Sequence, residues 1–487
     1  MSHAASPVRK RINHALDESS GTHRQRRIWA LAGAGIGLDG YDLFIMSAAV
    51  PLLRNQFDLG TAGLIAWLGA AAVIGAIPGA MVAGVLADRF GRRVVLRVDV
   101  FVFAATAVAC AVAWNPMSLI VFRLVQGFAI GAEYPISASL VAEVMPRRNR
   151  GQWMTGAFSF QAVGMVLAAG VSTMILLIVK DDTAWRWMLL SGLVPAVVVG
   201  VLRQRLPESP RWLARQGRTR EAVAALGWLL GPEVARSVAR RKGRKGKQRA
   251  ASATRAEEVA EVSELPGRTG QLRDLFATPL RARTALVTIP WFVMDIALYG
   301  LGMFTPMIVL AALTSAGQAS GGAVGGSFMA VDLEATAAAT LSDAFLVVGF
   351  IINILLVERA GRMRLQLLGF VGMAVGTTII AVTSQSGHAT ALVIAGFVVF
   401  NVAVNLGPNA TTYLIPAEVF PTRLRTTGHG FAAACGKLGA TLGVLILPTA
   451  LADYGRMPVM FALGGLCVLG ALFTLLLRVE TRGAAIA

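Results

Sequence analysis

Two short charged segments, 270 residues apart, decide how this sequence is organised. The first reads Asp88-Arg89-Phe90-Gly91-Arg92, and the second reads Glu358-Arg359-Ala360-Gly361-Arg362. A second pair repeats in the same way, since Glu143-x-x-Pro146-x-x-x-Arg150 matches Glu418-x-x-Pro421-x-x-x-Arg425, 275 residues later. The chain therefore contains two copies of one structural unit, with charged segments at corresponding places in each copy.

Long apolar blocks lie on both sides of these charged segments. The chain of 487 residues is 55% hydrophobic and 15% charged, and its mean hydropathy is +0.63. Many of the blocks reach or approach the roughly 20 residues that cross a bilayer core. We therefore expect an all-α membrane protein with twelve transmembrane helices, at residues 28–53, 62–87, 94–114, 117–144, 152–178, 186–203, 284–314, 337–357, 364–383, 389–417, 427–450 and 457–477.

The net charge of +18 is explained by membrane topology rather than by nucleic-acid binding. Arginines gather in alternate polar gaps, whereas the gaps between them contain chiefly Arg54, Lys180 and Arg456. Because cytoplasmic loops carry the excess of Lys and Arg, both ends of the chain are predicted to be cytoplasmic. The preference for Arg over Lys suggests a GC-rich bacterial genome, and hence the cell membrane.

The polar segments divide the chain into domains. A basic cytoplasmic linker, 204–283, separates a bundle at 28–203 from a bundle at 284–477, and tails are predicted at 1–27 and 478–487. The like charges at the centre of the linker, residues 240–249, predict disorder, with contact to anionic lipid as the alternative. A flexible outer loop is predicted at 315–327. The scattered cysteines are interpreted as core residues: Cys110, Cys435 and Cys467.

A few charged side chains fall inside the apolar blocks, where a charge is costly and indicates function. Arg123 is expected to pair within the first half of the chain. The spacing of four between Trp291, Asp295 and Tyr299 places these three side chains on one face of a helix. The alternative is that Asp295 only joins two helices by a hydrogen bond. The other candidates are Asp39, Asp42, Glu133 and Lys437.

Helices 4 and 5 add uncharged polar candidates. Tyr134 follows Glu133, and Pro135 comes next, where a proline can open the backbone hydrogen bonding of the helix beside a site. Gln161 stands alone among apolar residues of helix 5. These side chains are expected to contribute to a central polar site.

Helix 10 adds two asparagines, Asn405 and Asn409, that are four residues apart. Gly407 and Pro408 lie between them and are expected to break the helix, as happens at the central sites of transporters. The nearby Thr411 and Thr412 are interpreted as contacts between helices.

The segment Gly84-Val-Leu-Ala-Asp88-Arg-Phe-Gly-Arg-Arg93 resembles the loop signature of the major facilitator superfamily. Residues 207–213, Pro-Glu-Ser-Pro-Arg-Trp-Leu, and residues 479–483, Val-Glu-Thr-Arg-Gly, resemble its sugar-porter-like branch. The resemblance implies two pseudosymmetric six-helix bundles around a central site. A conformational latch of charged residues on the cytoplasmic side is also expected, and we assign it to Asp88, Arg92, Glu143, Arg150, Glu358, Arg362, Glu418 and Arg425.

The segment Asp39-Gly-Tyr-Asp42-Leu-Phe and the stretch from Asn405 to Lys437 resemble the phosphate:proton symporter family. That resemblance implies proton passage through Asp39 or Asp42, together with Glu133, which stands where the family often has Asp. It also implies a phosphate site, formed by Tyr134, Gln161, Trp291, Asp295, Tyr299 and one of Asn405 and Asn409.

Charge considerations make Asp295 the predicted coupling residue. A phosphate monoanion and a carboxylate repel each other in a cleft of low dielectric unless one of them is protonated. Protonated Asp295 would tolerate the anion, ionised Asp295 would help to expel it, and Lys437 would balance the remaining charge.

Other functions remain to be weighed against phosphate symport. A carrier of organic acids or sugars is the first alternative, because related bacterial organic-acid carriers share the Asp39 to Asp42 segment. A receptor that binds a nutrient without moving it is the second. The sequence has no nucleophile–base pair, metal cluster or nucleotide loop, so we predict neither an enzyme nor a cofactor. The predicted partners are phosphate, a proton and membrane lipid, with the chain acting as a monomer.

Overall fold

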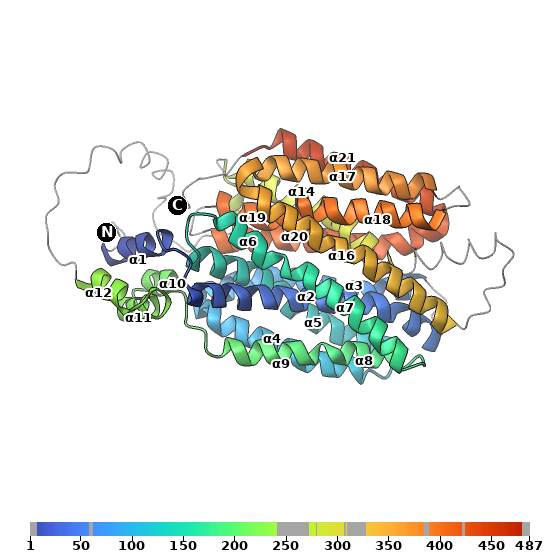
Figure 1. The fold of residues 1–487 in the computed structure, drawn as a ribbon, viewed down its shortest axis with the longest axis horizontal. Helices are drawn as coiled ribbons and strands as arrows, with labels where there is room; N and C mark the ends of the chain where they lie inside the picture. Colours follow the sequence, from blue (N-terminus) through green and yellow to red (C-terminus); the bar gives the residue numbers. More distant parts are fainter. Residues whose placement is uncertain are drawn as a thin grey trace.

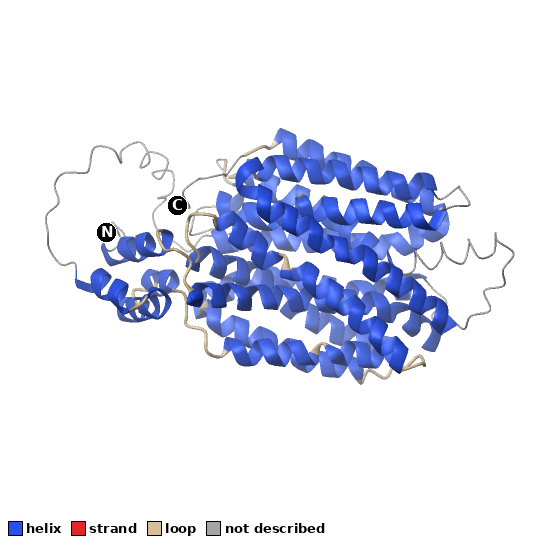
Figure 2. Cartoon of the chain, viewed as in Figure 1, coloured by secondary structure: helices blue, strands red, loops and turns tan. Residues whose placement is uncertain are grey.

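Helices make up almost all of the described chain in the computed structural model (Figure 2). The structure describes residues 7–57, 62–240, 272–278, 280–305, 308, 328–383, 389–420 and 424–479. Within these ranges, twelve segments are long and apolar enough to cross a membrane. The predicted number of transmembrane helices is therefore confirmed.

The first half of the chain supplies six of these segments. α2 begins five residues before its predicted start, because Thr22 and Gln25 form a reciprocal capping box at its amino end. Two of the segments are each divided into two helices. The bounds are α2 (His23–Gln56), α3 (Ala62–Phe90), α4 (Arg92–Ala111), α5 (Pro116–Val144), α6 (Arg150–Phe158) with α7 (Phe160–Ile178), and α8 (Ala184–Ser191) with α9 (Leu193–Arg203).

The second half supplies the other six segments (Figure 1). A short 3₁₀ helix, η2 (Leu272–Phe276), precedes them. The bounds are α14 (Arg281–Met303), α16 (Phe328–Ala360), α17 (Arg362–Val382), α18 (Ala389–Leu406) with α19 (Pro408–Val419), α20 (Arg425–Tyr454) and α21 (Arg456–Leu476).

The two halves pack in the same way. In the first half α2 contacts α7, α3 contacts α5, and α4 contacts α9. The corresponding pairs in the second half are α14 with α20, α16 with α18, and α17 with α21. The halves meet through α3 against α20 and α7 against α16, which are again equivalent pairs. This pseudosymmetry confirms the predicted major facilitator fold.

Helices α1 (Pro7–Asp17), α10 (Pro210–Arg215), α11 (Thr219–Leu230) and α12 (Pro232–Arg240) lie together at one end of the molecule, which we call the linker end (Figure 1). This helical structure was not predicted, because the segments 1–27 and 204–283 are too polar to show the periodicity of a membrane span. Of the run predicted to be disordered at 240–249, Arg240 is the last residue of α12, and the other residues lie outside the described chain, as does the predicted loop at 315–327.

Asp17, the last residue of α1, connects the linker end to the first bundle. Its Oδ1 accepts hydrogen bonds from Arg150 Nη2 at 2.6 Å and from Arg211 Nη2 at 2.7 Å. Burial raises the pKa of the Asp17 carboxyl, but Arg211 and Arg150 lower it by a larger amount. The pKa of Asp17 therefore lies below its usual value. Asp17 is therefore held as a carboxylate between two arginines.

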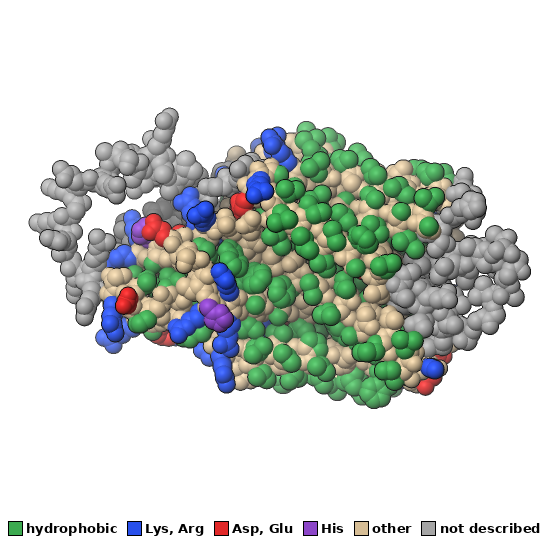
Figure 3. Space-filling view, in the orientation of Figure 1, with side chains coloured by type: hydrophobic (Ala, Val, Ile, Leu, Met, Phe, Trp, Pro, Cys, Tyr) green, Lys and Arg blue, Asp and Glu red, His purple; other side chains and the backbone are tan. Residues whose placement is uncertain are grey.

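The surface is consistent with insertion in a membrane. Apolar side chains cover the sides of the long helices on the face shown in Figure 3, and basic side chains gather toward the linker end. Large apolar residues such as Phe101 and Ile178 are each 73% exposed, as expected for helices whose outer faces contact lipid.

The predicted break in helix 10 is present. α18 ends at Leu406 and α19 begins at Pro408. A Cβ on Gly407 would lie 2.3 Å from the Leu365 carbonyl oxygen, so only glycine allows this close approach to α17. By contrast, α5 continues through Pro135, and the structure shows no break where we expected the proline to open the helix.

Candidate functional site

Polar side chains from both halves meet between the two bundles. Gln161 on α7 donates from Nε2 to the Tyr134 hydroxyl on α5 at 2.6 Å, and to the Tyr299 hydroxyl on α14 at 3.4 Å. Asn409 on α19 donates from Nδ2 to Gln161 Oε1 at 3.2 Å. Tyr134, Tyr299 and Asn409 are each more than 25 positions from Gln161 in the sequence, yet the four side chains form one buried network. We call this network, together with Lys437 and Asp295, the central cluster.

Lys437 is the cation of the central cluster. Its Nζ donates to the Tyr299 hydroxyl at 2.5 Å and lies 3.7 Å from Asp295 Oδ2. The same atom lies 4.7 Å from the ring centre of Tyr134 and 4.1 Å from that of Tyr299. Because Lys437 and Asp295 are 2% and 1% exposed, each charge depends on these neighbours for stabilisation.

The two asparagines of helix 10 have different surroundings. Asn405 donates from Nδ2 to the Leu346 carbonyl at 3.0 Å, so its donor is used within the second half. Its Oδ1 accepts a hydrogen bond from Asn409 at 2.7 Å. Asn409 is the one that also contacts Gln161 in the first half. Asn409 is therefore the asparagine that joins the network between the two halves, whereas Asn405 contacts only residues of the second half.

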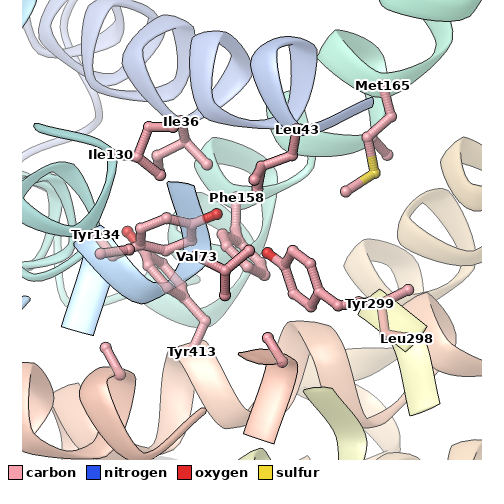
Figure 4. Packing of buried hydrophobic residues seen from close by; sticks show 14 of the residues in the cluster. Ile36, Leu43, Val73, Ile130, Tyr134, Phe158, Met165, Leu298, Tyr299 and Tyr413 are labelled. Carbon is pink, nitrogen blue, oxygen red and sulfur yellow. The ribbon is translucent and has the colours of Figure 1, made fainter. Parts of the chain in front are cut away.

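Aromatic side chains form a layer on the linker side of the central cluster. Tyr413 stacks on Phe158 with ring centres 4.2 Å apart and an interplanar angle of 5°. His429 meets Tyr413 and Trp291 edge to face, at 5.2 and 5.7 Å. Trp291 is thus placed in the layer, one helical turn from Asp295. Figure 4 shows Tyr134, Phe158, Tyr299 and Tyr413 grouped between the two halves.

Phe158 and Tyr413 were not predicted as site residues. Phe158 comes from an apolar stretch, and Tyr413 follows two threonines that were interpreted as contacts between helices. The stack joins α6 to α19, 255 residues apart in the chain, so no local pattern indicates it. We refer to Phe158, Tyr413, His429 and Trp291 as the aromatic layer.

Asp42 is not part of the central cluster. Its Oδ2 accepts a hydrogen bond from Arg123 Nη1 at 2.6 Å, so Arg123 pairs within the first half, as expected. Asp39 lies one helical turn earlier on α2. It is buried, and its Oδ2 has no hydrogen-bond partner among the described residues. Of the two aspartates of the Asp39 to Asp42 segment, Asp42 is the one held in an ion pair with Arg123.

Glu133 also points away from the central cluster. Its two carboxylate oxygens accept hydrogen bonds from Arg203, at 2.8 Å to Nη1 and 2.6 Å to Nη2. Asp99 lies beside this pair, with Oδ2 4.0 Å from Arg203 Nη1. Neither Arg203 nor Asp99 was predicted, because both lie near helix ends, where a charged residue reads as the boundary of a membrane span.

The repeated charged segments form two equivalent networks at the linker end. Arg92 bridges Asp88 at 2.9 Å and Glu143 at 3.0 Å. In the second half Arg362 bridges Glu358 at 3.0 Å and Glu418 at 2.8 Å. The closing arginines of the two motifs differ from this pattern, because Arg150 contacts Asp17 and Arg425 is buried at the start of α20.

The second-half network also contacts the first half. Glu358 Oε1 accepts a hydrogen bond from the Gly151 backbone N–H at 2.9 Å, and Gln152 Nε2 donates to the Ile354 carbonyl at 3.1 Å. These contacts close the linker end between the bundles. A cavity of about 1020 Å³ lies beside them, lined by residues of both halves that include Arg150, Glu358 and Arg362.

We predict that Glu358→Gln opens the linker end. The change removes the charge that holds Gly151 and Arg362, at a loss of about 1 kcal/mol or roughly fivefold in population. The rate of labelling of a cysteine introduced at Ser139 measures this opening. The Ser139 hydroxyl lies against Thr426 of the other half, so faster labelling indicates that the halves have separated there. Asp88→Asn is the matched control with a smaller expected effect, since Asp88 pairs with Arg92 of its own half and with Arg215 of α10, not with the other half. Equal labelling of both variants and the parent would contradict this latch.

In the part of the chain that the structure describes, twelve segments are long and apolar enough to cross a membrane. Their arrangement in two equivalent halves, with a buried polar cluster between them, defines a secondary transporter of the major facilitator superfamily. The chain matches the sugar (and other) transporter family over residues 28–486 and belongs to that family.

Similar proteins agree with this assignment. The chain is 29% identical to "Probable inorganic phosphate transporter 1-10" of Oryza sativa subsp. japonica, over 96% of this chain and 90% of that protein. It is also 29% identical to the inner membrane metabolite transport protein YgcS of Escherichia coli, over 94% of this chain and 92% of the other. A solved structure of the proton:xylose symporter XylE has the same fold, with a TM-score of 0.75 at 20% identity over 97% of this chain and 98% of that one.

Proposed function

We propose that this protein is a proton-coupled symporter of inorganic phosphate that works by alternating access. The observation that carries the proposal is the central cluster, in which Lys437, Tyr134, Gln161, Tyr299 and Asn409 come from both halves. Relatives named as inorganic phosphate transporters support the same cargo. We further propose that it acts as a monomer in the cell membrane, with the linker end in the cytoplasm.

The donors of the central cluster suit a phosphate monoanion. The Lys437 ammonium, the hydroxyls of Tyr134 and Tyr299, and the amides of Gln161 and Asn409 can donate to phosphate oxygens. The carbonyl oxygen of protonated Asp295 can accept a hydrogen bond from a phosphate hydroxyl. A single lysine in place of an arginine fork holds the anion less tightly, which favours release.

Protonation of Asp295 links the movement of the proton to the movement of phosphate. While Asp295 is ionised, it neutralises Lys437 and repels an arriving anion. Once it is protonated, Lys437 is free to contact phosphate. The tilt of the two halves then exposes the site to the other side, where the Phe158–Tyr413 stack of the aromatic layer must separate to let phosphate leave.

Uptake of labelled phosphate into proteoliposomes, with and without an imposed pH gradient, tests this function. We expect uptake to follow the gradient, and sulfate, sugars and aromatic acids to compete poorly. Strong competition by a sugar or an organic acid would assign the site to that cargo instead. Saturable binding without accumulation would indicate a receptor.

The donors of the central cluster give a graded prediction. Tyr134→Phe removes one hydroxyl and should weaken phosphate binding by about 0.5–1.5 kcal/mol, which is up to roughly tenfold. Gln161→Ala should weaken it more, because Gln161 contacts Tyr134, Tyr299 and Asn409. The concentration for half-maximal uptake measures both effects. Tyr454→Phe is the control, since Tyr454 is 72% exposed. A Gln161→Ala variant with unchanged half-saturation would remove this network from the phosphate site.

A further inference from the structure

An apolar groove lies between α14, α20 and α21 of the second half. Its volume is about 470 Å³, within the range of about 300–1,000 Å³ that is usual for small-molecule sites. Two of its lining residues, Ile446 on α20 and Ala462 on α21, are exposed, and α21 lies along the edge of the second half (Figure 1). The groove therefore opens toward lipid rather than toward the central cluster, and we call it the lateral groove.

The floor of the lateral groove is formed where α14 and α20 touch through their backbones. A Cβ on Gly439 would lie 2.1 Å from the Phe292 carbonyl oxygen, and one on Gly443 would lie 2.3 Å from that of Ile296. These helices are already as close as glycine allows, so they cannot close the groove by moving nearer to each other. Because an empty apolar hollow loses the packing contacts of its lining, the groove favours an occupant.

The lateral groove has about the length of one membrane leaflet. On α20 its lining extends from Leu442 to Tyr454, the last residue of the helix, which is about 18 Å along the axis. Half of a hydrocarbon core is about 15 Å thick. α20 begins at Arg425, near the linker end, so the groove lies in the leaflet opposite that end. Apart from Tyr454, every lining residue is apolar or glycine, which suits an acyl chain.

A basic side chain stands at the end of the lateral groove. Gly455 makes the turn between α20 and α21 with a φ of +77°, a conformation that favours glycine. Arg456 follows as the first residue of α21, between the lining residues Tyr454 and Pro458. It is half-buried, and among the described residues it forms no ion pair, even with the exposed Asp453. Arg456 is therefore available to an anionic group at the level of the lipid headgroups.

These features fit a phospholipid better than a second copy of the chain. In a two-fold dimer the same surface lies on both sides of the contact, so the hollow would face the same hollow and the two Arg456 side chains would approach each other. A phospholipid instead offers an acyl chain to the groove and a negative phosphate to the guanidinium. An anionic headgroup suits Arg456 better than a choline headgroup, which brings a second positive charge.

We propose that the lateral groove binds one acyl chain of an anionic phospholipid in the leaflet opposite the linker end, with the lipid phosphate on Arg456. The chain contacts α14, α20 and α21 at once. It packs against Phe292 and Ile296, which directly follow Trp291 and Asp295 in the sequence, and so supports the helix that carries part of the central cluster. The site does not depend on which cargo the protein transports.

Photo-crosslinking in vesicles tests this site. The full-length protein is placed in phosphatidylcholine vesicles with a trace of phosphatidylglycerol that carries a diazirine on one acyl chain, and the labelled residues are located by mass spectrometry. We expect labelling to concentrate at residues 442–466 and to fall when unlabelled phosphatidylglycerol is added. A phosphatidylcholine probe with the same diazirine should label these residues about fivefold less. Even labelling of all lipid-facing helices, or equal labelling by the two probes, would overturn the proposal.

A second apolar hollow provides an internal control. It lies between α17 and α21, has a volume of about 330 Å³, and has no basic residue among its described lining residues. Labelling there, at Val371 and Val468 for example, should be the same with both probes. An equal preference for phosphatidylglycerol at both hollows would indicate a general attraction to the basic protein and would overturn the role of Arg456.

Two substitutions separate the acyl chain from the headgroup. Ala462→Trp fills the groove and should remove the selective labelling. Leu469→Trp is its matched control, because Leu469 on α21 is 45% exposed and lies outside the lining of the groove. Arg456→Gln should lower labelling by phosphatidylglycerol about fivefold, to the level of the phosphatidylcholine probe. Arg456→Lys should retain most of it, because the charge remains.

The outcomes of these variants decide the occupant. Selective labelling that is unchanged in both Ala462→Trp and Arg456→Gln would overturn the proposal. If Ala462→Trp does not fold, the comparison of Arg456→Gln with Arg456→Lys decides. A disulfide between two copies of an Ala462→Cys variant that displaces the probe would assign the groove to a second copy of the chain and would also overturn the lipid site.

Discussion

Replacement of Lys437 by glutamine is expected to abolish phosphate uptake. Lys437 is the cation of the central cluster, and a hydrogen bond to a charged group contributes about 1.5–3 kcal/mol. Its loss also leaves Asp295 buried without a partner for its charge, which costs about 3–5 kcal/mol. We therefore expect phosphate binding at least about 100-fold weaker, as measured by the half-saturation of uptake or by binding to the purified protein.

A double variant separates binding from folding. Lys437→Gln alone should lower the thermal stability, whereas Asp295→Asn/Lys437→Gln should recover much of it, because no unpaired charge remains. Uptake should stay absent in both. Lys180→Gln, at an exposed position between α7 and α8, controls for the loss of one positive charge. Normal half-saturation in a folded Lys437→Gln variant would exclude Lys437 from the phosphate site.

Asp295→Asn is expected to uncouple phosphate movement from the pH gradient. Asparagine has the shape of the protonated acid, so Lys437 stays free and phosphate binding should persist or become tighter. Exchange of phosphate across the membrane should continue, because it does not require the proton to cycle. Accumulation should fall from up to about tenfold per pH unit for each coupled proton to about onefold, as measured with and without an imposed gradient.

The phosphate affinity of this variant follows from the position of Asp295. Asp295 lies 3.7 Å from Lys437, so its neutralisation should leave phosphate affinity unchanged or make binding tighter. Asp453→Asn is the control for the chemical change, because Asp453 is exposed on α20. Persistent gradient-driven accumulation by Asp295→Asn would remove this residue from the proton path and leave Asp39, Asp42 or Glu133 as its carriers.

The fold was largely predictable because the membrane restricts it. Only helices satisfy their own backbone within lipid, so apolar length alone predicts the twelve spans. The repeats at Asp88 and Glu358 predict the two equivalent halves. Helix ends were less predictable: α2 begins at His23 because of a capping box. The helices α10 to α12 form in a segment that is too polar to show the pattern of a membrane span.

The site was predicted in part. Asp295, Tyr299 and Lys437 are conspicuous because a polar residue is rare within an apolar block, and the structure brings all three together. The partner of each charge was harder to predict, since Asp42 contacts Arg123, and Glu133 contacts Arg203, across helices far apart in sequence. Phe158 has no local signal at all, and Asp99 lies so near the start of its span that its charge resembles a span boundary. Pairing between helices depends on which faces meet, and periodicity within one helix does not contain that information.

The position of α1 has a consequence for how the protein is made. Residues 7–17 are synthesised well before their partners: Arg150 is 133 residues beyond Asp17, and Arg211, which also donates to Asp17, is 194 residues beyond Asp17. The six spans described in the first half are all synthesised before Arg211. The α1 helix must therefore wait for the first bundle to be inserted, and its docking marks the completion of that bundle during biosynthesis.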